Sequence, residues 1–139
     1  MLFSLTYFSS ATTEFSAADL KQLLATVRPR NAADDITGML LYHDGSFAQA
    51  LEGPAEQVRR TFDRICLDRR HRGIYVAFED EITERAFPDW AMSFRDLGGA
   101  AAREAEGFST FVQDVRAGRP VPGDTAPHHL LRAFSRPVL

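Results

Sequence analysis

Lysine, cysteine and long apolar runs are scarce in this sequence of 139 residues. Lys21 is the only lysine, and the arginines are scattered apart from the run DRRHR at 68–72, so there is no basic stripe of the kind that binds nucleic acid. The single cysteine, Cys66, excludes an internal disulfide framework and fits a reducing compartment. No apolar run is long enough to span a bilayer, and the first residues lack the basic start of a signal peptide. We therefore expect a cytoplasmic protein that binds neither nucleic acid nor membrane.

The remaining composition is that of an ordinary globular protein. Hydrophobic residues make up 45% of the chain and charged residues 25%, and the net charge is −3. This length predicts one domain with a short extension. A net charge this small indicates no strong electrostatic partner.

The first third of the chain predicts a strand, a helix and a loop. Alternating apolar residues predict a strand over 2–8, and the following SSATT predicts a turn. Ser16 and Asp19 have the spacing of an approximate capping box at a helix start. Pro29 cannot continue that helix, so 28–35 is predicted as a loop. The buried stripe of the helix comprises Leu20, Leu23, Leu24 and Val27, and the loop carries Arg30 and Asn31.

Further along, the pattern predicts a hairpin, a second helix and two more strands. Asp44-Gly45 separates two apolar runs, which predicts antiparallel strands over 36–43 and 46–52. Glu52 is expected to accept hydrogen bonds from backbone donors at the end of the second of these strands. The later elements are a helix over 54–68, with Pro54 suited to its first turn, and strands over 73–82 and 90–97.

The element order is therefore βαββαββ, an α+β chain with a ferredoxin-like sheet and both helices on one face. In this arrangement the first and third strands are expected to lie parallel and central. Beyond residue 98, a helix over 102–117 and a short one through HHLLRAF are expected to cover the other face of the sheet, or to bind a partner. The apolar strip at that end comprises Leu130, Leu131 and Phe134.

Two polar side chains fall on the face that the helices are expected to cover. Tyr7 shares a face with the apolar residues of the first strand, and Gln49 lies between Phe47 and Leu51 on the third. An unsatisfied buried amide costs about 1–3 kcal/mol, so Gln49 needs partners. The pattern leaves two interpretations open. Gln49 bonds Tyr7 and backbone or water with no ligand, or these groups, with Asn31, hold a planar heterocycle.

Five segments together resemble the BLUF domain, a flavin-binding blue-light sensor. They are LTYFS, RNAADDITGMLLY, GSFAQALEG, DRRHRG and FPDWAMSF, in this order and spacing. The resemblance assigns residues 1–97 to a BLUF flavin-binding domain and leaves 98–139 as a C-terminal helical extension.

The resemblance implies noncovalent FAD, with FMN or riboflavin as alternatives. It implies that Tyr7 donates an electron and a proton under blue light and that rearrangement of Gln49 produces a red-shifted state without net catalysis. Signal transmission would pass through Trp90 or Met92 to a separate downstream protein, or through a change of homo-oligomeric assembly. The cofactor-binding residues that it implies are Tyr7, Leu23, Arg30, Asn31, Phe47, Gln49, Ile65, Asp68, Arg70 and His71.

Two other functions remain as alternatives. One is a light-insensitive ferredoxin-like scaffold or adaptor. The other is an acylphosphatase-like hydrolase, but its phosphate-cradling loop is not matched by SSATTEFS, which has neither glycine nor arginine. No residues have the ligand spacing of a zinc site, so no metal is expected.

Overall fold

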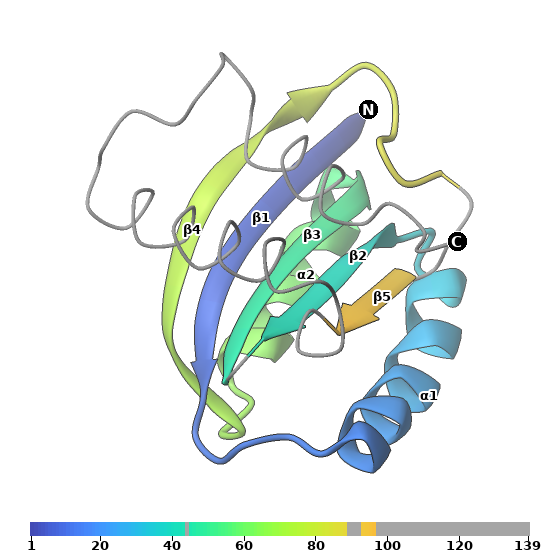
Figure 1. Ribbon diagram of the computed structural model, residues 1–139. Coiled ribbons are helices and arrows are strands. Elements are labelled where there is room, and N and C mark those ends of the chain that lie inside the picture. Colours follow the sequence, from blue (N-terminus) through green and yellow to red (C-terminus); the bar gives the residue numbers. More distant parts are fainter. Residues whose placement is uncertain (44, 89–92, 97–139) are drawn as a thin grey trace.

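A computed structural model describes residues 1–43, 45–88 and 93–96 of the chain. Within these residues five strands form one sheet in the order β4-β1-β3-β2-β5, and two helices pack against it (Figure 1). The βαββαββ order and the central position of the first and third strands are confirmed. The elements are β1 (Leu2–Ala11), α1 (Ala17–Ala33), β2 (Thr37–His43), β3 (Ser46–Pro54), α2 (Ala55–Cys66), β4 (His71–Ile82) and β5 (Ser93–Asp96). Trp90, Met92 and the helices expected beyond residue 98 lie outside the described residues.

The direction of the central strands differs from the prediction. β1 pairs with β3 in antiparallel register, not parallel, and β1–β4 and β2–β3 are also antiparallel. The connection through α1 places β2 parallel in direction to β1, and the hairpin between β2 and β3 then reverses the chain direction. β3 therefore runs opposite to β1. Only β5 pairs in parallel, with β2, among the strands of the described residues.

Helix α1 begins where the sequence indicates. Oγ of Ser16 accepts a hydrogen bond from the backbone N–H of Asp19 at 3.1 Å, and the Asp19 carboxylate accepts one from the N–H of Ser16 at 2.9 Å. This reciprocal pair satisfies two donors that a helix start leaves without partners. It also holds the pKa of the Asp19 carboxyl below its usual range.

The end of α1 was predicted wrongly. The exposed Pro29 stays inside the helix, which runs on to Ala33, so Arg30 and Asn31 lie on its last turns and not in a loop. Proline has no backbone N–H to donate, but the two carbonyl groups after it both accept hydrogen bonds. Asp34 N–H donates to the carbonyl of Arg30 at 3.1 Å, and Ile36 N–H donates to that of Asn31 at 2.8 Å. These two bonds lie at the end of the helix, where the Asn31 side chain is buried.

Strand β1 is also longer than predicted. The residues read as the start of a turn, Ser9–Ala11, continue the strand, because Ser10 pairs with Ser46 and Ala11 with His71. The N–H of Ala11 also donates to the carbonyl of Gly45 at 2.7 Å. A strand of 10 residues thereby carries Tyr7 near its middle.

The core lies between the sheet and the two helices. Leu5, Tyr7, Phe47 and Leu51 face Leu20 and Leu24 of α1 and Val58 of α2 in one buried cluster, so both helices cover the same face (Figure 1). This arrangement confirms the predicted parity of β1 and β3. No helix in the described part of the chain is long and apolar enough to cross a membrane.

Glu52 forms hydrogen bonds with the connection between β4 and β5. Its carboxylate is fully buried and accepts hydrogen bonds from the N–H groups of Ala86 and Phe87, both at 2.7 Å. The expectation that Glu52 satisfies backbone donors is confirmed. Next to it, Gly53 cannot carry a Cβ, because that atom would lie 2.6 Å from the carbonyl oxygen of Asp35.

Candidate functional site

Tyr7 and Gln49 form the centre of the site. They are directly paired across β1 and β3, and the Tyr7 hydroxyl donates a hydrogen bond to Oε1 of Gln49. Both side chains are buried, with 4% and 7% of their surface exposed. The sheet therefore brings a phenol and a carboxamide together where water is scarce, as the strand parity predicted.

Burial controls the chemistry of the Tyr7 phenol. It raises the pKa of the phenol far above its ordinary value, and the negative potential of Cys66 and Asp68 raises it further. The phenol is therefore protonated throughout the neutral range and donates its proton to the hydrogen bond with Gln49. Phe62 and His71 pack around its ring, with centroids at 5.6 and 6.2 Å.

A cavity opens beside this pair, between the C-terminal turns of α1 and α2 and the sheet. Its empty volume is about 870 Å³, which includes the part open to solvent. All ten residues predicted to bind a cofactor line it, namely Tyr7, Leu23, Arg30, Asn31, Phe47, Gln49, Ile65, Asp68, Arg70 and His71. The structure thus brings the whole predicted set together around one cavity, and their contact with a cofactor stays a prediction.

Six lining residues were not predicted from the sequence. They are Phe15, Thr26, Val27, Leu40, Thr61 and Arg64. Helical spacing holds a signal for several of them, because Thr26, Val27 and Arg30 follow Leu23 on one face of α1, and Thr61 precedes Ile65 by four residues on α2. Ending the first helix at Pro29 hid the relation between Leu23 and Arg30.

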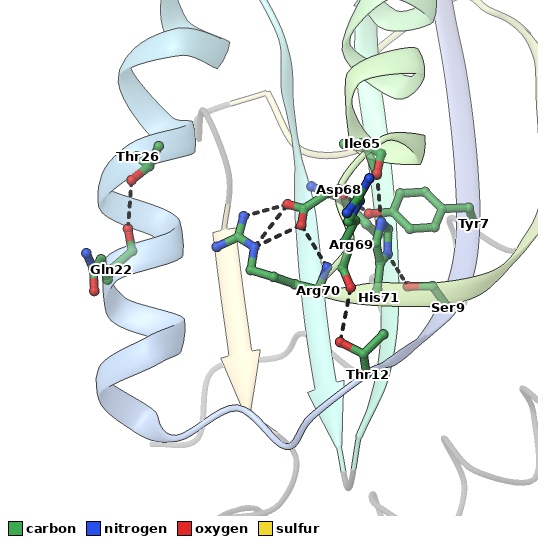
Figure 2. Close-up of polar contacts among 11 residues, drawn as sticks. Tyr7, Ser9, Thr12, Gln22, Thr26, Ile65, Asp68, Arg69, Arg70 and His71 are labelled. Carbon is green, nitrogen blue, oxygen red and sulfur yellow. Dashed lines mark hydrogen bonds and ion pairs between the residues drawn. The ribbon is translucent and has the colours of Figure 1, made fainter.

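The mouth of the cavity is charged. Asp68 and Arg70 form an ion pair in which Nε of Arg70 donates to both carboxylate oxygens, at 3.0 and 3.1 Å (Figure 2). The hydrogen bonds from Arg70 hold the pKa of the Asp68 carboxyl below its usual range, although partial burial opposes them. Arg30 and Arg64, by contrast, have no acidic partner among the described residues.

His71 lines the cavity with both ring nitrogens engaged. Nδ1 lies 2.8 Å from Oγ of Ser9, and Nε2 lies 2.7 Å from the carbonyl oxygen of Ile65 (Figure 2). Figure 2 also shows the ring of Tyr7 reaching from β1 toward His71 and the end of α2. His71 can therefore present its ring to a ligand, but its nitrogen atoms already have protein partners.

The lining fits a flat, mostly apolar ring with polar edges. Leu23, Phe47 and Ile65 supply apolar walls, and Asn31 and Gln49 supply amides. The hydroxyl of Thr61 is buried without a hydrogen-bond partner in the part of the chain that the structure describes. A buried hydroxyl in such a state is destabilising unless a bound group satisfies it. The same residues contain no cluster of three or more His, Cys, Asp or Glu able to hold a metal ion.

Comparison with known proteins identifies relatives of this chain. A family model described as sensors of blue-light using FAD (BLUF) matches residues 2–93. Photoactivated adenylate cyclase subunit beta of Euglena longa is 40% identical over 93 residues, which are 66% of this chain and 11% of that protein. The blue light- and temperature-regulated antirepressor BluF of Escherichia coli K12 is 34% identical over 97 residues, which are 70% of this chain and 24% of that protein. The chain thus spans a small part of these relatives.

Solved structures agree with this comparison. The dark-state structure of BlrB, a BLUF protein, matches with a TM-score of 0.73 and 32% identity, and the match covers 95% of this chain and 96% of that one. A bacterial light-regulated adenylyl cyclase matches with a TM-score of 0.79 and 31% identity, over 84% of this chain and 36% of that one. The chain is therefore similar in extent to BlrB and to one part of the cyclase.

Proposed function

The chain belongs to the BLUF family of blue-light sensors that use FAD, and we propose that Tyr7 and Gln49 are its photoactive pair. The observation that carries this proposal is the hydrogen bond from the buried phenol to the buried amide at the edge of a cavity. In this proposal both residues regain their starting composition after each light response, so the chain senses light without net catalysis.

Different cavity residues contact different parts of the flavin. Leu23, Phe47 and Ile65 pack against the ring system, and Asn31 bonds its polar edge. This assignment is supported by the 3% exposure of Asn31 at the end of α1 and by the placement of all four residues on one cavity. A bound flavin supplies a chromophore that becomes a strong oxidant when it absorbs blue light.

Tyr7 is the residue that gives up an electron. Its phenol is buried and neutral, and loss of an electron makes a phenol strongly acidic, so the hydroxyl proton leaves with it. Oε1 of Gln49 is the acceptor already in hydrogen-bond contact. The electron and the proton return to Tyr7 before the red-shifted state is reached, so the proposed cycle involves no net chemistry.

Gln49 stores the change. Its amide carries two donors and an acceptor, so rotation or tautomerisation exchanges a donor for an acceptor at the same place. After Tyr7 recovers its proton, the amide is left in the alternative arrangement. The hydrogen bonds around the chromophore then differ from those in the dark, and this difference is the red-shifted signalling state.

The cofactor that suits the cavity mouth best is a phosphorylated flavin, FAD or FMN. Arg30 and Arg64 stand on the last turns of α1 and α2 and both line the cavity. Guanidinium groups bind phosphate through paired charged hydrogen bonds. Because neither arginine has an acidic partner within the described residues, both are available to the phosphate end of the ligand.

The signal leaves by the edge of the sheet. β5 pairs with β2, which in turn pairs with the Gln49 strand β3. Trp90 and Met92, which precede β5, are the proposed transmitters to a separate downstream protein or to a change of homo-oligomeric assembly. Cyclase and antirepressor relatives show that sensors of this kind serve different effectors.

One experiment tests this function. The purified chain, loaded with FAD and illuminated with blue light, should show a small red shift that reverses in the dark. A protein that binds no flavin, or that binds it and shows no shift, would contradict the proposal and favour the light-insensitive scaffold.

A further inference from the structure

Ser9, Ile65 and His71 form a hydrogen-bonded cluster, which we name the histidine clamp. The His71 ring spans the two partners, with Nδ1 at 2.8 Å from Oγ of Ser9 and Nε2 at 2.7 Å from the carbonyl oxygen of Ile65. Ser9 is on β1, Ile65 is on the last turn of α2 and His71 begins β4. One side chain thereby joins three segments that line the cavity.

The partners of His71 determine its tautomer. A carbonyl oxygen only accepts hydrogen bonds, so Nε2 carries a proton and donates it to Ile65. In a neutral ring Nδ1 is then bare, and the Ser9 hydroxyl donates to it. Both nitrogen atoms are saturated by the protein, which leaves His71 no polar atom to offer a ligand.

The clamp lies where the sheet is irregular. The pairing of β1 with β4 shifts register between Thr6 and Tyr7 and again between Phe8 and Ser10, and Ser9 has no paired residue in β4. The backbone on both sides of Tyr7 is therefore held less regularly than elsewhere in the ladder. Ser9 follows Tyr7 by two residues, so its side chain lies on the same face of β1. Its hydrogen bond to His71 therefore holds this part of β1 against the start of β4 in place of the missing backbone pairing.

The second hydrogen bond of the clamp connects His71 to α2. The carbonyl of Ile65 belongs to the last helical turn, whose carbonyls lack donors within the helix. It accepts from His71 and from the N–H of Asp68 at 3.1 Å. The His71 ring also packs edge-on against Tyr7, with centroids 6.2 Å apart. The phenol is therefore enclosed by the same group that joins its strand to the helix.

We propose that His71 is a positioning residue, whose clamp sets the place of the Tyr7 phenol in the cavity, and that it makes no hydrogen bond to the flavin. This inference rests on the proposed function for its effect on the photoreaction. It differs from the implied ligand-binding role of His71, because the ring acts through Tyr7. A flavin that approaches His71 meets carbon atoms only.

Matched variants separate positioning from ligand binding. Ser9→Ala removes one donor, His71→Phe keeps an aromatic ring without nitrogens, and His71→Gln restores one donor and one acceptor. Thr12→Val is the control, because Thr12 Oγ1 donates to the carbonyl of Arg69 at 3.1 Å and so links the residue after β1 to the connection between α2 and β4 at an exposed place.

The clamp predicts a specific pattern among these proteins when each is loaded with FAD. Ser9→Ala and His71→Phe should bind FAD within about threefold of the wild type. Their yield of red-shifted state should fall by about threefold or more, because the donor is misplaced. The fluorescence lifetime of bound FAD should lengthen, since Tyr7 quenches it less well. His71→Gln should recover part of the yield, and Thr12→Val should behave as the wild type.

Two results would overturn the proposal. One is a wild-type yield and lifetime in both Ser9→Ala and His71→Phe. The other is a loss of FAD affinity by about tenfold in His71→Phe with normal binding in Ser9→Ala, which would make His71 a ligand of the flavin.

A measurement on the unaltered protein covers the case in which the variants fail to fold. The ¹⁵N shifts of His71 should show a protonated Nε2 hydrogen-bonded to a carbonyl, both before and after FAD is added. A switch of tautomer or loss of that bond on loading would refute the clamp. If the loaded wild type shows no light response, the proposed function fails, but the ¹⁵N result still decides whether the clamp exists.

Discussion

Tyr7 and Gln49 stand directly opposite each other on the antiparallel strands β1 and β3, with the phenol donating to the amide oxygen. Opposed residues of an antiparallel pair have their Cβ atoms about 4.5–5.5 Å apart. The backbone ladder, and not a loop, therefore determines their separation. This rigid alignment is what allows one proton position to be coupled to the orientation of one amide.

Replacement of Gln49 by leucine tests the amide. Gln49→Leu should leave flavin binding in place and abolish the red shift, because leucine has no acceptor for the Tyr7 proton. The buried hydroxyl of Tyr7 also loses its partner, which should lower the free energy of unfolding by about 1–3 kcal/mol. Difference absorption and urea unfolding measure the two effects. Gln22→Leu, on the exposed side of α1, is the control. Normal photocycling in Gln49→Leu would refute the storage role.

Alkaline pH should reveal the burial of Tyr7. The phenol has a pKa above its ordinary value of 10.0 in the folded chain, so the unfolded chain releases this proton first. The contribution of Tyr7 to stability is complete below pH 10.0 and is lost as pH rises above it. The loss approaches about 1.4 kcal/mol per pH unit. The free energy of unfolding, measured by urea titration, should fall more steeply with pH above 10.0 for the wild type than for Tyr7→Phe. Equal slopes for the two proteins would contradict the burial of an uncharged phenol.

Arg64 should affect which flavin binds. Arg64→Gln is expected to lower the affinity for FMN and FAD by about tenfold, because it removes one charged contact to phosphate. The affinity for riboflavin, which has no phosphate, should stay nearly unchanged. Arg60→Gln, one turn earlier on α2 and outside the cavity lining, is the matched control. Titrations with the three flavins measure the ratio of affinities. An equal loss for riboflavin, or no change for any flavin, would remove Arg64 from the phosphate site.

Much of the site could be predicted because strand parity is a local rule. The alternation around Tyr7 and Gln49 places both on the helix-covered face, and the Asp-Gly pair fixes where β2 and β3 meet. The hydrogen bond between Tyr7 and Gln49 also requires the antiparallel register of β1 with β3, a pairing that was predicted wrongly as parallel. The capping box at Ser16 was predictable in the same way, since it depends on two residue types at a definite spacing. Backbone donors for Glu52 were also expected, but their identity as Ala86 and Phe87 has no local signal in the sequence.

Other features depend on contacts that the sequence pattern does not express. Pro29 is an unfavourable residue inside a helix, yet α1 continues past it to an end where the carbonyls of Arg30 and Asn31 accept backbone hydrogen bonds. The length of β1 depends on partners more than 30 residues away, at Ser46 and His71. Local propensity is a weak guide where such tertiary contacts decide the outcome.

The central claim is that Tyr7 drives the light response, and the absorption spectrum of Tyr7→Phe loaded with FAD and illuminated with blue light tests it most directly. The variant should bind FAD as the wild type does and show no red shift, while Tyr75→Phe, on the exposed part of β4, keeps it. A reversible red shift of wild-type size in Tyr7→Phe would contradict the account.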